Sequence, residues 1–200
     1  MKQQIIVIHG GDTFDSAKKY LAYLKEKKVD WEQMKAKKWK EDLSQKLGRN
    51  FEVIAPKMPN SNNSKYLEWK IWFEKLIPFF HKEVILLGHS LGGIFLAKYL
   101  SANKFSKKIR GVFLVAPPFD AKNSDYSLAD FTLPKKLTKL AKQGGQIFLY
   151  HSQDDPVVSF VDLAKYQKQL PSAKVRIFTN RQHFNQDKFP EIVRDIKNLF

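Results

Sequence analysis

A serine set between two glycines has the clearest chemical meaning in this sequence. Gly88, Ser90 and Gly92 form a Gly-x-Ser-x-Gly pattern that follows an apolar run and precedes residues that favour a helix. A serine at the tip of a sharp strand-to-helix turn holds its hydroxyl above the sheet edge, where it can attack a carbonyl carbon. Small residues must flank it, because side chains there would collide with the turn. The pattern predicts that Ser90 is a nucleophile rather than an incidental serine in a glycine-rich turn.

A serine hydroxyl becomes reactive only when a general base removes its proton, and histidine most often does so. In a fold built around this turn the histidine comes last in the chain, which leaves His151 and His183. His151 ends an expected strand and is expected to be structural. His183 follows the last expected strand, at the edge where parallel sheets bind ligands. We therefore predict His183 as the base.

An aspartate is needed to orient the histidine and to stabilise its imidazolium form. The loop that follows the expected strand 146–151 contains two candidates, Asp154 and Asp155. The one that does not serve the histidine is expected to be a turn or helix-cap residue.

Two backbone N–H groups are candidates for stabilising an oxyanion. The N–H of Leu91 lies at the start of the helix after Ser90, where helices present free donors and a positive dipole. The second donor is expected from the loop His9-Gly10-Gly11-Asp12, with the Gly11 N–H as first choice and Asp12 as the alternative. One such donor contributes about 3–4 kcal/mol to transition-state stabilisation in measured cases.

Six apolar runs predict the strands that position these residues. Several are continuous rather than alternating, as in strands covered on both faces, and helical segments separate them. We therefore predict one α/β domain over residues 1–200, with a six-stranded, mostly parallel sheet, helices on both faces and no large cap. The expected strands are Gln4–His9, Phe51–Ala55, Glu83–Gly88, Arg110–Ala116, Gln146–His151 and Lys174–Thr179.

Two connections are longer than one helix requires. The lysine-rich segment 13–50 has apolar residues at near-helical intervals and predicts two amphipathic helices, with a turn at Val29-Asp30 and an end at Gly48. Segment 117–142 contains three prolines and the polar stretch 122–125, and predicts a loop and a short helix positioned to cover a pocket.

Charge and composition limit the classes of partner. The net charge is +15, but only five of the 35 basic residues are arginine and the lysines are spread along the chain. Arginine is the residue that preferentially binds phosphate groups through two hydrogen bonds. Because arginine is scarce here, we expect a solvated basic surface and no nucleic-acid partner. The absence of cysteine excludes disulfides, cysteine-zinc sites and thiol nucleophiles. The first apolar run is too short for a signal peptide, and no run approaches a membrane span, so we expect a cytoplasmic protein.

Four motifs together resemble the α/β-hydrolase superfamily, and in particular the compact serine hydrolases of the YdeN and retinoblastoma-binding-protein type. They are His9-Gly10-Gly11, Gly88-His89-Ser90-Leu91-Gly92-Gly93, Asp155-Pro156-Val157-Val158 and Gln182-His183-Phe184. The resemblance favours Asp155 over Asp154, because Asp155 begins the family's D-x-x-V ending of this loop. Two residues depart from the pattern: Gln182 and Ser159 stand where many relatives have glycine and proline.

The resemblance implies hydrolysis of a small-molecule carboxylic ester through an acyl-enzyme on Ser90, with neither metal nor organic cofactor. One alternative is thioester hydrolysis, acyl transfer or peptide cleavage with the same three residues. Another is a non-catalytic binding protein on the same fold, which the +15 charge and the lysine-rich segment favour. The sequence leaves the substrate, the oligomeric state and the role of segment 13–50 open.

Overall fold

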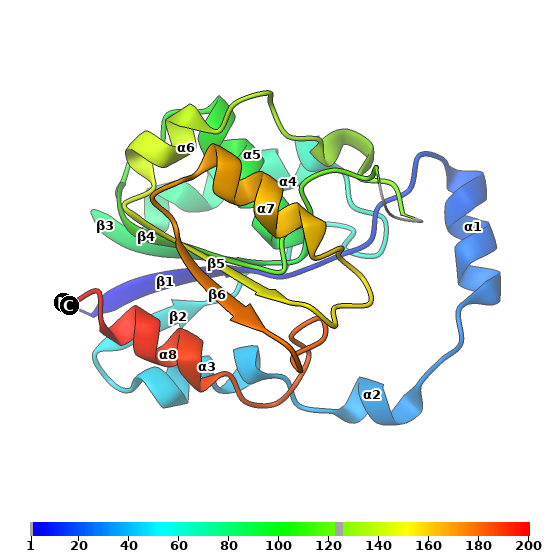
Figure 1. The fold of residues 1–200 in the computed structure, drawn as a ribbon, viewed down its shortest axis with the longest axis horizontal. Coiled ribbons are helices and arrows are strands. Elements are labelled where there is room, and N and C mark those ends of the chain that lie inside the picture. Colours follow the sequence, from blue (N-terminus) through cyan, green and yellow to red (C-terminus); the bar gives the residue numbers. More distant parts are fainter. Residues whose placement is uncertain (1, 123–125) are drawn as a thin grey trace.

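The computed structural model describes residues 2–122 and 126–200, apart from the side chain of Gln33. Its six strands form one parallel sheet in the order β2-β1-β3-β4-β5-β6 (Figure 1). All six predicted strands are confirmed, with ends that differ by at most two residues. The strands are β1 (Gln3–Ile8), β2 (Phe51–Ile54), β3 (Glu83–His89), β4 (Lys108–Val115), β5 (Gln146–Ser152) and β6 (Lys174–Phe178).

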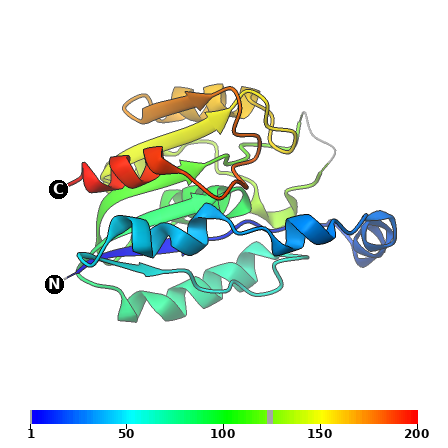
Figure 2. The same ribbon diagram turned by 90° about the horizontal axis from the view of Figure 1, so that it is seen from below.

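Helices cover both faces of the sheet, which explains why the central strands are continuously apolar. One face packs against α4 (Tyr66–Leu76), α5 (Leu91–Ala102), α6 (Thr138–Gln143) and α7 (Val161–Gln169). The other face packs against α3 (Trp39–Leu47) and α8 (Pro190–Lys197) (Figure 2). The predicted α/β architecture with helices on both faces is confirmed.

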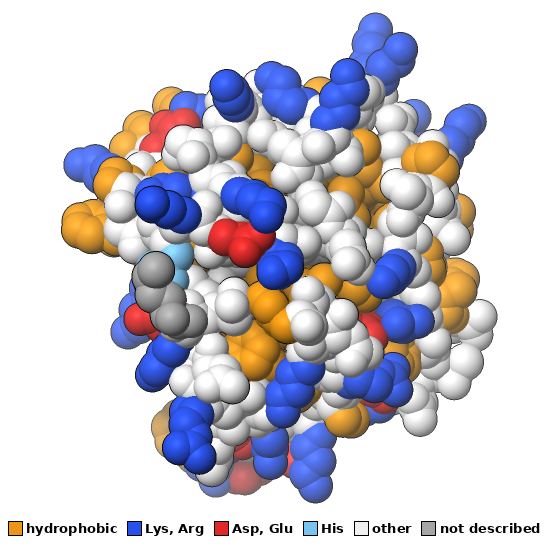
Figure 3. Space-filling view, turned by 90° about the vertical axis from the view of Figure 1, so that its left-hand side faces the viewer, with side chains coloured by type: hydrophobic (Ala, Val, Ile, Leu, Met, Phe, Trp, Pro, Cys, Tyr) orange, Lys and Arg blue, Asp and Glu red, His pale blue; other side chains and the backbone are white. Residues whose placement is uncertain are grey.

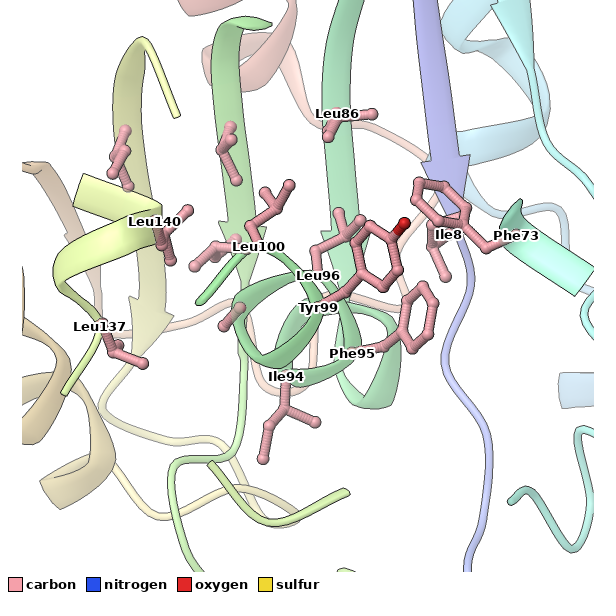
Figure 4. Close-up of a cluster of buried hydrophobic side chains, with 14 of the residues drawn as sticks. Ile8, Phe73, Leu86, Ile94, Phe95, Leu96, Tyr99, Leu100, Leu137 and Leu140 are labelled. Atoms are coloured by element: carbon pink, nitrogen blue, oxygen red, sulfur yellow. The ribbon is translucent and has the colours of Figure 1, made fainter. Parts of the chain in front are cut away.

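Two apolar clusters fill the space between the sheet and these helices. The larger lies under α4 to α7, where α5 brings Phe95, Leu96 and Tyr99 onto the sheet beside Phe73 of α4 (Figure 4). Burial of apolar surface stabilises the fold by roughly 25 cal/mol per Å². Because α5 begins directly after Ser90, this packing also fixes the turn that carries the serine hydroxyl.

Segment 13–50 forms three helices where the sequence predicts two: α1 (Ala17–Glu26), α2 (Trp31–Lys35) and α3. Gly48 ends α3 as predicted, with φ at 89°. An amphipathic helix ordinarily packs its apolar face, and α3 does so. The helix α1 buries no residue, and both views place α1 and α2 away from the sheet (Figures 1 and 2). The apolar spacing is shared along the segment, but only α3 reaches the core.

Segment 117–142 contains a short 3-10 helix, η2 (Ala129–Phe131), followed by α6. Residues 123–125 of its polar stretch lie outside the described residues. Within residues 2–122 and 126–200, no helix has the length and apolar character needed to cross a bilayer. Basic side chains are dispersed over the face that holds the chain termini (Figure 3), so the positive charge is not confined to one patch.

Candidate active site

Ser90 occupies a strained turn between β3 and α5. Its backbone has φ 56° and ψ −123°, a left-handed conformation that costs a non-glycine residue about 1–3 kcal/mol. The Ser90 N–H donates a 2.8 Å hydrogen bond to the Val115 carbonyl of β4, which holds the turn to the sheet. A Cβ on Gly88 would lie 2.4 Å from the Gly92 carbonyl oxygen, and a Cβ on Gly92 would lie 2.3 Å from the Ile8 carbonyl oxygen. Both positions therefore exclude any larger residue.

The carboxyl edge of the sheet brings three predicted side chains into one hydrogen-bonded chain. His183 Nε2 lies 2.9 Å from Ser90 Oγ. On the other side of the ring, His183 Nδ1 lies 3.1 Å and 2.9 Å from the two carboxylate oxygens of Asp155. The three residues are far apart in sequence but follow β3, β5 and β6, whose carboxyl ends meet at this edge.

These contacts fix the tautomer of the His183 ring. An ionised carboxylate only accepts hydrogen bonds, so Nδ1 carries the proton that Asp155 accepts. Nε2 is then free to accept the Ser90 hydroxyl proton. The Asp155 side chain is fully buried, and the backbone N–H groups of Val157 and Val158 also donate to its Oδ1 at 2.8 and 3.0 Å. The carboxylate is therefore held in position from two sides.

The neighbouring Asp154 holds the histidine loop through its backbone. Its exposed carboxylate accepts hydrogen bonds from the Ser152 hydroxyl and, at 3.0 Å, from the Gln182 N–H. The Ser152 hydroxyl lowers the pKa of Asp154 by donating to it. Asp154 thus ties the loop after β5 to the loop after β6, while Asp155 contacts the imidazole.

The predicted oxyanion donors lie at the start of α5 and on the loop after β1. Leu91 is the first residue of α5, and the first-turn N–H groups of a helix have no partner within it. The Asp12 N–H donates to the Ser61 carbonyl at 2.8 Å, whereas the Gly11 N–H makes no hydrogen bond with any residue that the structure describes. Of the two alternatives in this loop, Gly11 retains the free donor.

A half-buried lysine and a second, buried histidine lie behind His183. Lys40 Nζ lies 2.9 Å from His89 Nδ1, and His89 Nε2 lies 2.8 Å from the His183 carbonyl oxygen. An ammonium group only donates and a carbonyl only accepts, so the proton of the neutral His89 ring is on Nε2. Burial, with repulsion from Lys40, lowers the pKa of His89 well below its usual value. Burial lowers the pKa of Lys40 to about 8.

The helix α3 therefore supports the histidine loop through two adjacent residues. Besides the Lys40 contact, Trp39 Nε1 donates to the Phe184 carbonyl at 2.9 Å. The residues on both sides of His183 have positive φ, 45° at Gln182 and 53° at Phe184. The loop needs this support, because a left-handed backbone is unfavourable for residues other than glycine. Sequence reasoning missed Lys40 and His89: nothing in the spacing distinguishes Lys40 from the other lysines of its segment.

A cavity of about 770 Å³ opens beside Ser90. Apolar side chains form much of its wall, with Phe14, Leu91, Pro118, Leu128 and Val157 among them. Its outer wall is α1, which contributes Lys19, Ala22, Tyr23 and Glu26.

Two hydrogen bonds join the loop after β1 to the residues that precede η2, at the rim of the cavity. Thr13 donates to the Ser127 carbonyl, and the Ser127 hydroxyl donates to Asp15. Segment 117–142, which the sequence predicts to cover a pocket, contributes Pro118 and residues 126–128 to the lining of this cavity.

Metal chemistry would need a cluster of ligands. Among the residues that the structure describes, no three histidine, aspartate or glutamate side chains lie close enough together to hold a metal ion. Carboxylates line the cavity at Asp12, Asp15 and Glu26, but Lys19 lies 2.7 Å from Asp15 and Lys27 lies 3.8 Å from Asp12.

Comparisons with known proteins agree with this arrangement. Serine hydrolase RBBP9 of Rattus norvegicus is 24% identical over 151 residues, which cover 74% of this chain and 78% of the relative. The ydeN gene product of B. subtilis has a similar structure, with a TM-score of 0.72 at 17% identity over 100% of this chain and 99% of the other. Est1E of Butyrivibrio proteoclasticus, solved with ferulic acid bound, has a TM-score of 0.62 at 13% identity over 98% and 87%.

The similarity to the ydeN gene product and to Est1E shows a shared fold. Together with the RBBP9 match, it supports a compact α/β-hydrolase. A model of the serine hydrolase family matches residues 29–192, which is most of the chain. The match includes the strand-to-helix turn at Ser90, Asp154 and Asp155, and the loop that carries His183. The chain therefore belongs to the serine hydrolase family.

Proposed function

We propose that this hydrolase cleaves carboxylic esters through an acyl-enzyme on Ser90, with His183 as general base and Asp155 as its partner. The 2.9 Å contact between His183 Nε2 and Ser90 Oγ carries the proposal, because it is the path by which the hydroxyl proton leaves. The buried carboxylate of Asp155 supports it by holding the ring and by stabilising the imidazolium that forms.

In the first half of the reaction, Ser90 Oγ attacks the carbonyl carbon while its proton moves to His183 Nε2. The carbonyl oxygen becomes an oxyanion, which the N–H groups of Leu91 and Gly11 stabilise. Collapse of this intermediate breaks the ester C–O bond, and His183 returns its proton to the departing alkoxide. The product is an alcohol, and the acyl group stays on Ser90.

In the second half, His183 removes a proton from water, and the hydroxide attacks the acyl carbon. Collapse releases the carboxylic acid and returns the proton from His183 to Ser90 Oγ. Thioester hydrolysis, acyl transfer and peptide cleavage share this acyl-enzyme. The apolar wall of the 770 Å³ cavity favours a substrate with an apolar acyl group of several carbons.

Labelling with a fluorophosphonate probe tests the nucleophile directly, because the probe phosphonylates activated serines. We expect the probe on Ser90 of the folded wild-type protein and no labelling of Ser90→Ala. Turnover of p-nitrophenyl esters of increasing acyl length should fall by roughly 10⁴-fold or more in Ser90→Ala. A folded wild-type protein that neither labels nor turns over any of these esters would overturn the proposal and favour a binding role.

The role of Asp155 can be tested by making the same substitution at Asp155 and at its neighbour Asp154. We expect Asp155→Asn to lower kcat by about 10³–10⁴-fold, because the amide imposes the wrong tautomer on His183. Asp154→Asn should keep most of the activity, since an amide oxygen can still accept the Gln182 N–H. Equal losses in the two variants would contradict the assignment.

A further inference from the structure

An arm formed by residues 17–38, comprising α1, α2 and the residues that join them to α3, carries exposed apolar side chains. An ordered helix ordinarily buries its apolar residues, but none of the residues of α1 is buried. The exposed fractions are 56% for Leu21, 45% for Leu24, 74% for Val29, 65% for Trp31 and 70% for Met34.

Lysines are interleaved with these apolar side chains. The arm contains eight lysines, no arginine and three acidic residues, Glu26, Asp30 and Glu32. Four of its lysines pair with carboxylates at distances from 2.6 to 3.8 Å: Lys19, Lys27, Lys35 and Lys37. The arm therefore combines a net positive charge with exposed hydrocarbon, whereas basic residues are dispersed over the face that holds the chain termini (Figure 3).

The helix α1 has two different faces. Lys19, Ala22, Tyr23 and Glu26 line the cavity beside Ser90. Leu21 and Leu24 are three positions apart, so they project together, and neither lines that cavity. The ring of Phe14 contacts those of Tyr20 and Tyr23, with centroids 5.2 and 5.0 Å apart. The arm is thus anchored as the outer wall of the candidate site, with its leucines turned to solvent.

We propose that the arm docks on the surface of an anionic phospholipid bilayer, with its leucines, Trp31 and Met34 among the acyl chains and its lysines at the headgroups. Basic segments gain about 1 kcal/mol per lysine near such a surface, and interfacial helices combine this charge with apolar insertion. A second copy of the chain is a poorer occupant, because two positively charged arms repel. Nucleic acid is also poorer, because it offers no hydrocarbon to the apolar side chains.

Docking through the arm holds the cavity next to the bilayer. If Ser90 forms an acyl-enzyme, as proposed above, the substrate class is an amphiphile whose acyl chain enters from the lipid. This last step rests on the proposed function, whereas binding of the arm to the bilayer does not.

Co-sedimentation with vesicles tests the docking without using activity. We expect the full chain to sediment with vesicles of phosphatidylcholine and phosphatidylglycerol, and not with phosphatidylcholine alone. The combined variant Leu21→Ser, Leu24→Ser, Trp31→Ser and Met34→Ser should lose at least tenfold in affinity. A matched control is Leu67→Ser with Ile71→Ser, which removes exposed apolar residues of α4, 60% and 49% exposed, far along the chain.

Tryptophan fluorescence gives a second readout that does not depend on mutating the arm. In a Trp72→Phe background, Trp31 is the one exposed tryptophan, because Trp39 and Trp69 are buried. Its emission should shift to shorter wavelength with anionic vesicles and be quenched by brominated acyl chains. Circular dichroism of each variant checks that it is folded.

The proposal is overturned if the wild-type protein fails to bind anionic vesicles, or if the α4 control loses as much affinity as the arm variant. Retention on DNA or on a second copy of the chain, without vesicle binding or a Trp31 shift, also overturns it. Fluorophosphonate labelling of Ser90 without lipid is measured separately. If Ser90 is not labelled but the protein still binds anionic vesicles, only the proposed function is rejected.

Discussion

The two halves of the lysine-rich connection between β1 and β2 have the same kind of sequence and opposite structural roles. In the second half, α3 buries Trp39, Leu43 and Leu47. It contacts the histidine loop directly through Trp39, and Lys40 supports the loop indirectly through His89. In the first half, the arm leaves Trp31 65% exposed and its helix α1 has no buried residue. Both halves combine aromatic and aliphatic residues with lysine.

The difference shows that position relative to the sheet, rather than composition, decides what such a segment does. The helix α3 lies against the sheet face beside α8, where its apolar residues complete a cluster. It therefore belongs to the machinery that holds His183. The arm extends past the carboxyl edge of the sheet (Figure 1), where the core does not reach. It is available to a partner outside the molecule.

Truncating one tryptophan in each half is the strongest test of this contrast. Trp39→Ala should lower the free energy of unfolding by about 3–5 kcal/mol, because it leaves a cavity in the core and an unpaired Phe184 carbonyl. Trp31→Ala should change it by less than about 0.5 kcal/mol, as is usual for an exposed side chain. Urea denaturation measures both, and similar losses would show that the arm packs on the body in solution.

The pH dependence of stability tests the burial of Lys40, whose pKa is about 8 in the folded protein against 10.5 ordinarily. Below pH 8 both folded and unfolded chains carry this proton. Between pH 8 and 10.5 the unfolded chain retains a proton that the folded chain has lost, so stability rises with pH. The wild type should gain on the order of 2 kcal/mol over Lys40→Met across this interval.

The comparison of wild type with Lys40→Met isolates the titration of Lys40, because its charged neighbours are the same in both proteins. Lys38, Glu41 and His89 face the ammonium group and are present in both proteins. A flat difference between wild type and Lys40→Met from pH 8 to 10.5 in denaturant titrations would mean that this ammonium group is solvated like those of the arm.

Activity of Lys40→Met measures how far α3 positions the candidate base. Loss of the ammonium leaves His89 Nδ1 without its donor, which loosens the hydrogen bond that His89 makes to the His183 carbonyl. Small misplacement of a reacting group is costly, so kcat should fall roughly tenfold with little change in KM. Lys35→Met, at an exposed position of the arm, should leave both constants unchanged. A change confined to KM would argue against positioning.

The smallest expected effect concerns the strained backbone that α3 supports. Gln182 has φ 45°, and glycine adopts this conformation without strain. Gln182→Gly should therefore raise the free energy of unfolding by about 0.5–1 kcal/mol while the Asp154 contact to the backbone is kept. Thermal unfolding measures this change in stability. A loss of similar size, instead of a gain, would show that the Gln182 side chain itself holds the loop.

Much of the fold was predictable because buried parallel strands are marked by continuous apolar runs. The run before Ser90 is an example: residues 84–87 are all buried in β3. The resemblance also selected Asp155 from two adjacent aspartates, and the structure places that carboxylate, rather than Asp154, against the imidazole. The Lys40–His89 contact joins residues 49 positions apart, and no local pattern distinguishes Lys40 from neighbouring lysines.

The sequence by itself determined the strands, the strained elbow around Ser90 and the residue types that gather at the carboxyl edge, because periodicity and small-residue spacing are local properties. Only the tertiary structure decided which lysine is drawn out of solvent, which apolar residues remain exposed, and which ring nitrogen of each histidine carries the proton. These are set by the groups that approach from distant parts of the chain, and their burial and hydrogen bonding exist only once the sheet and its helices have assembled.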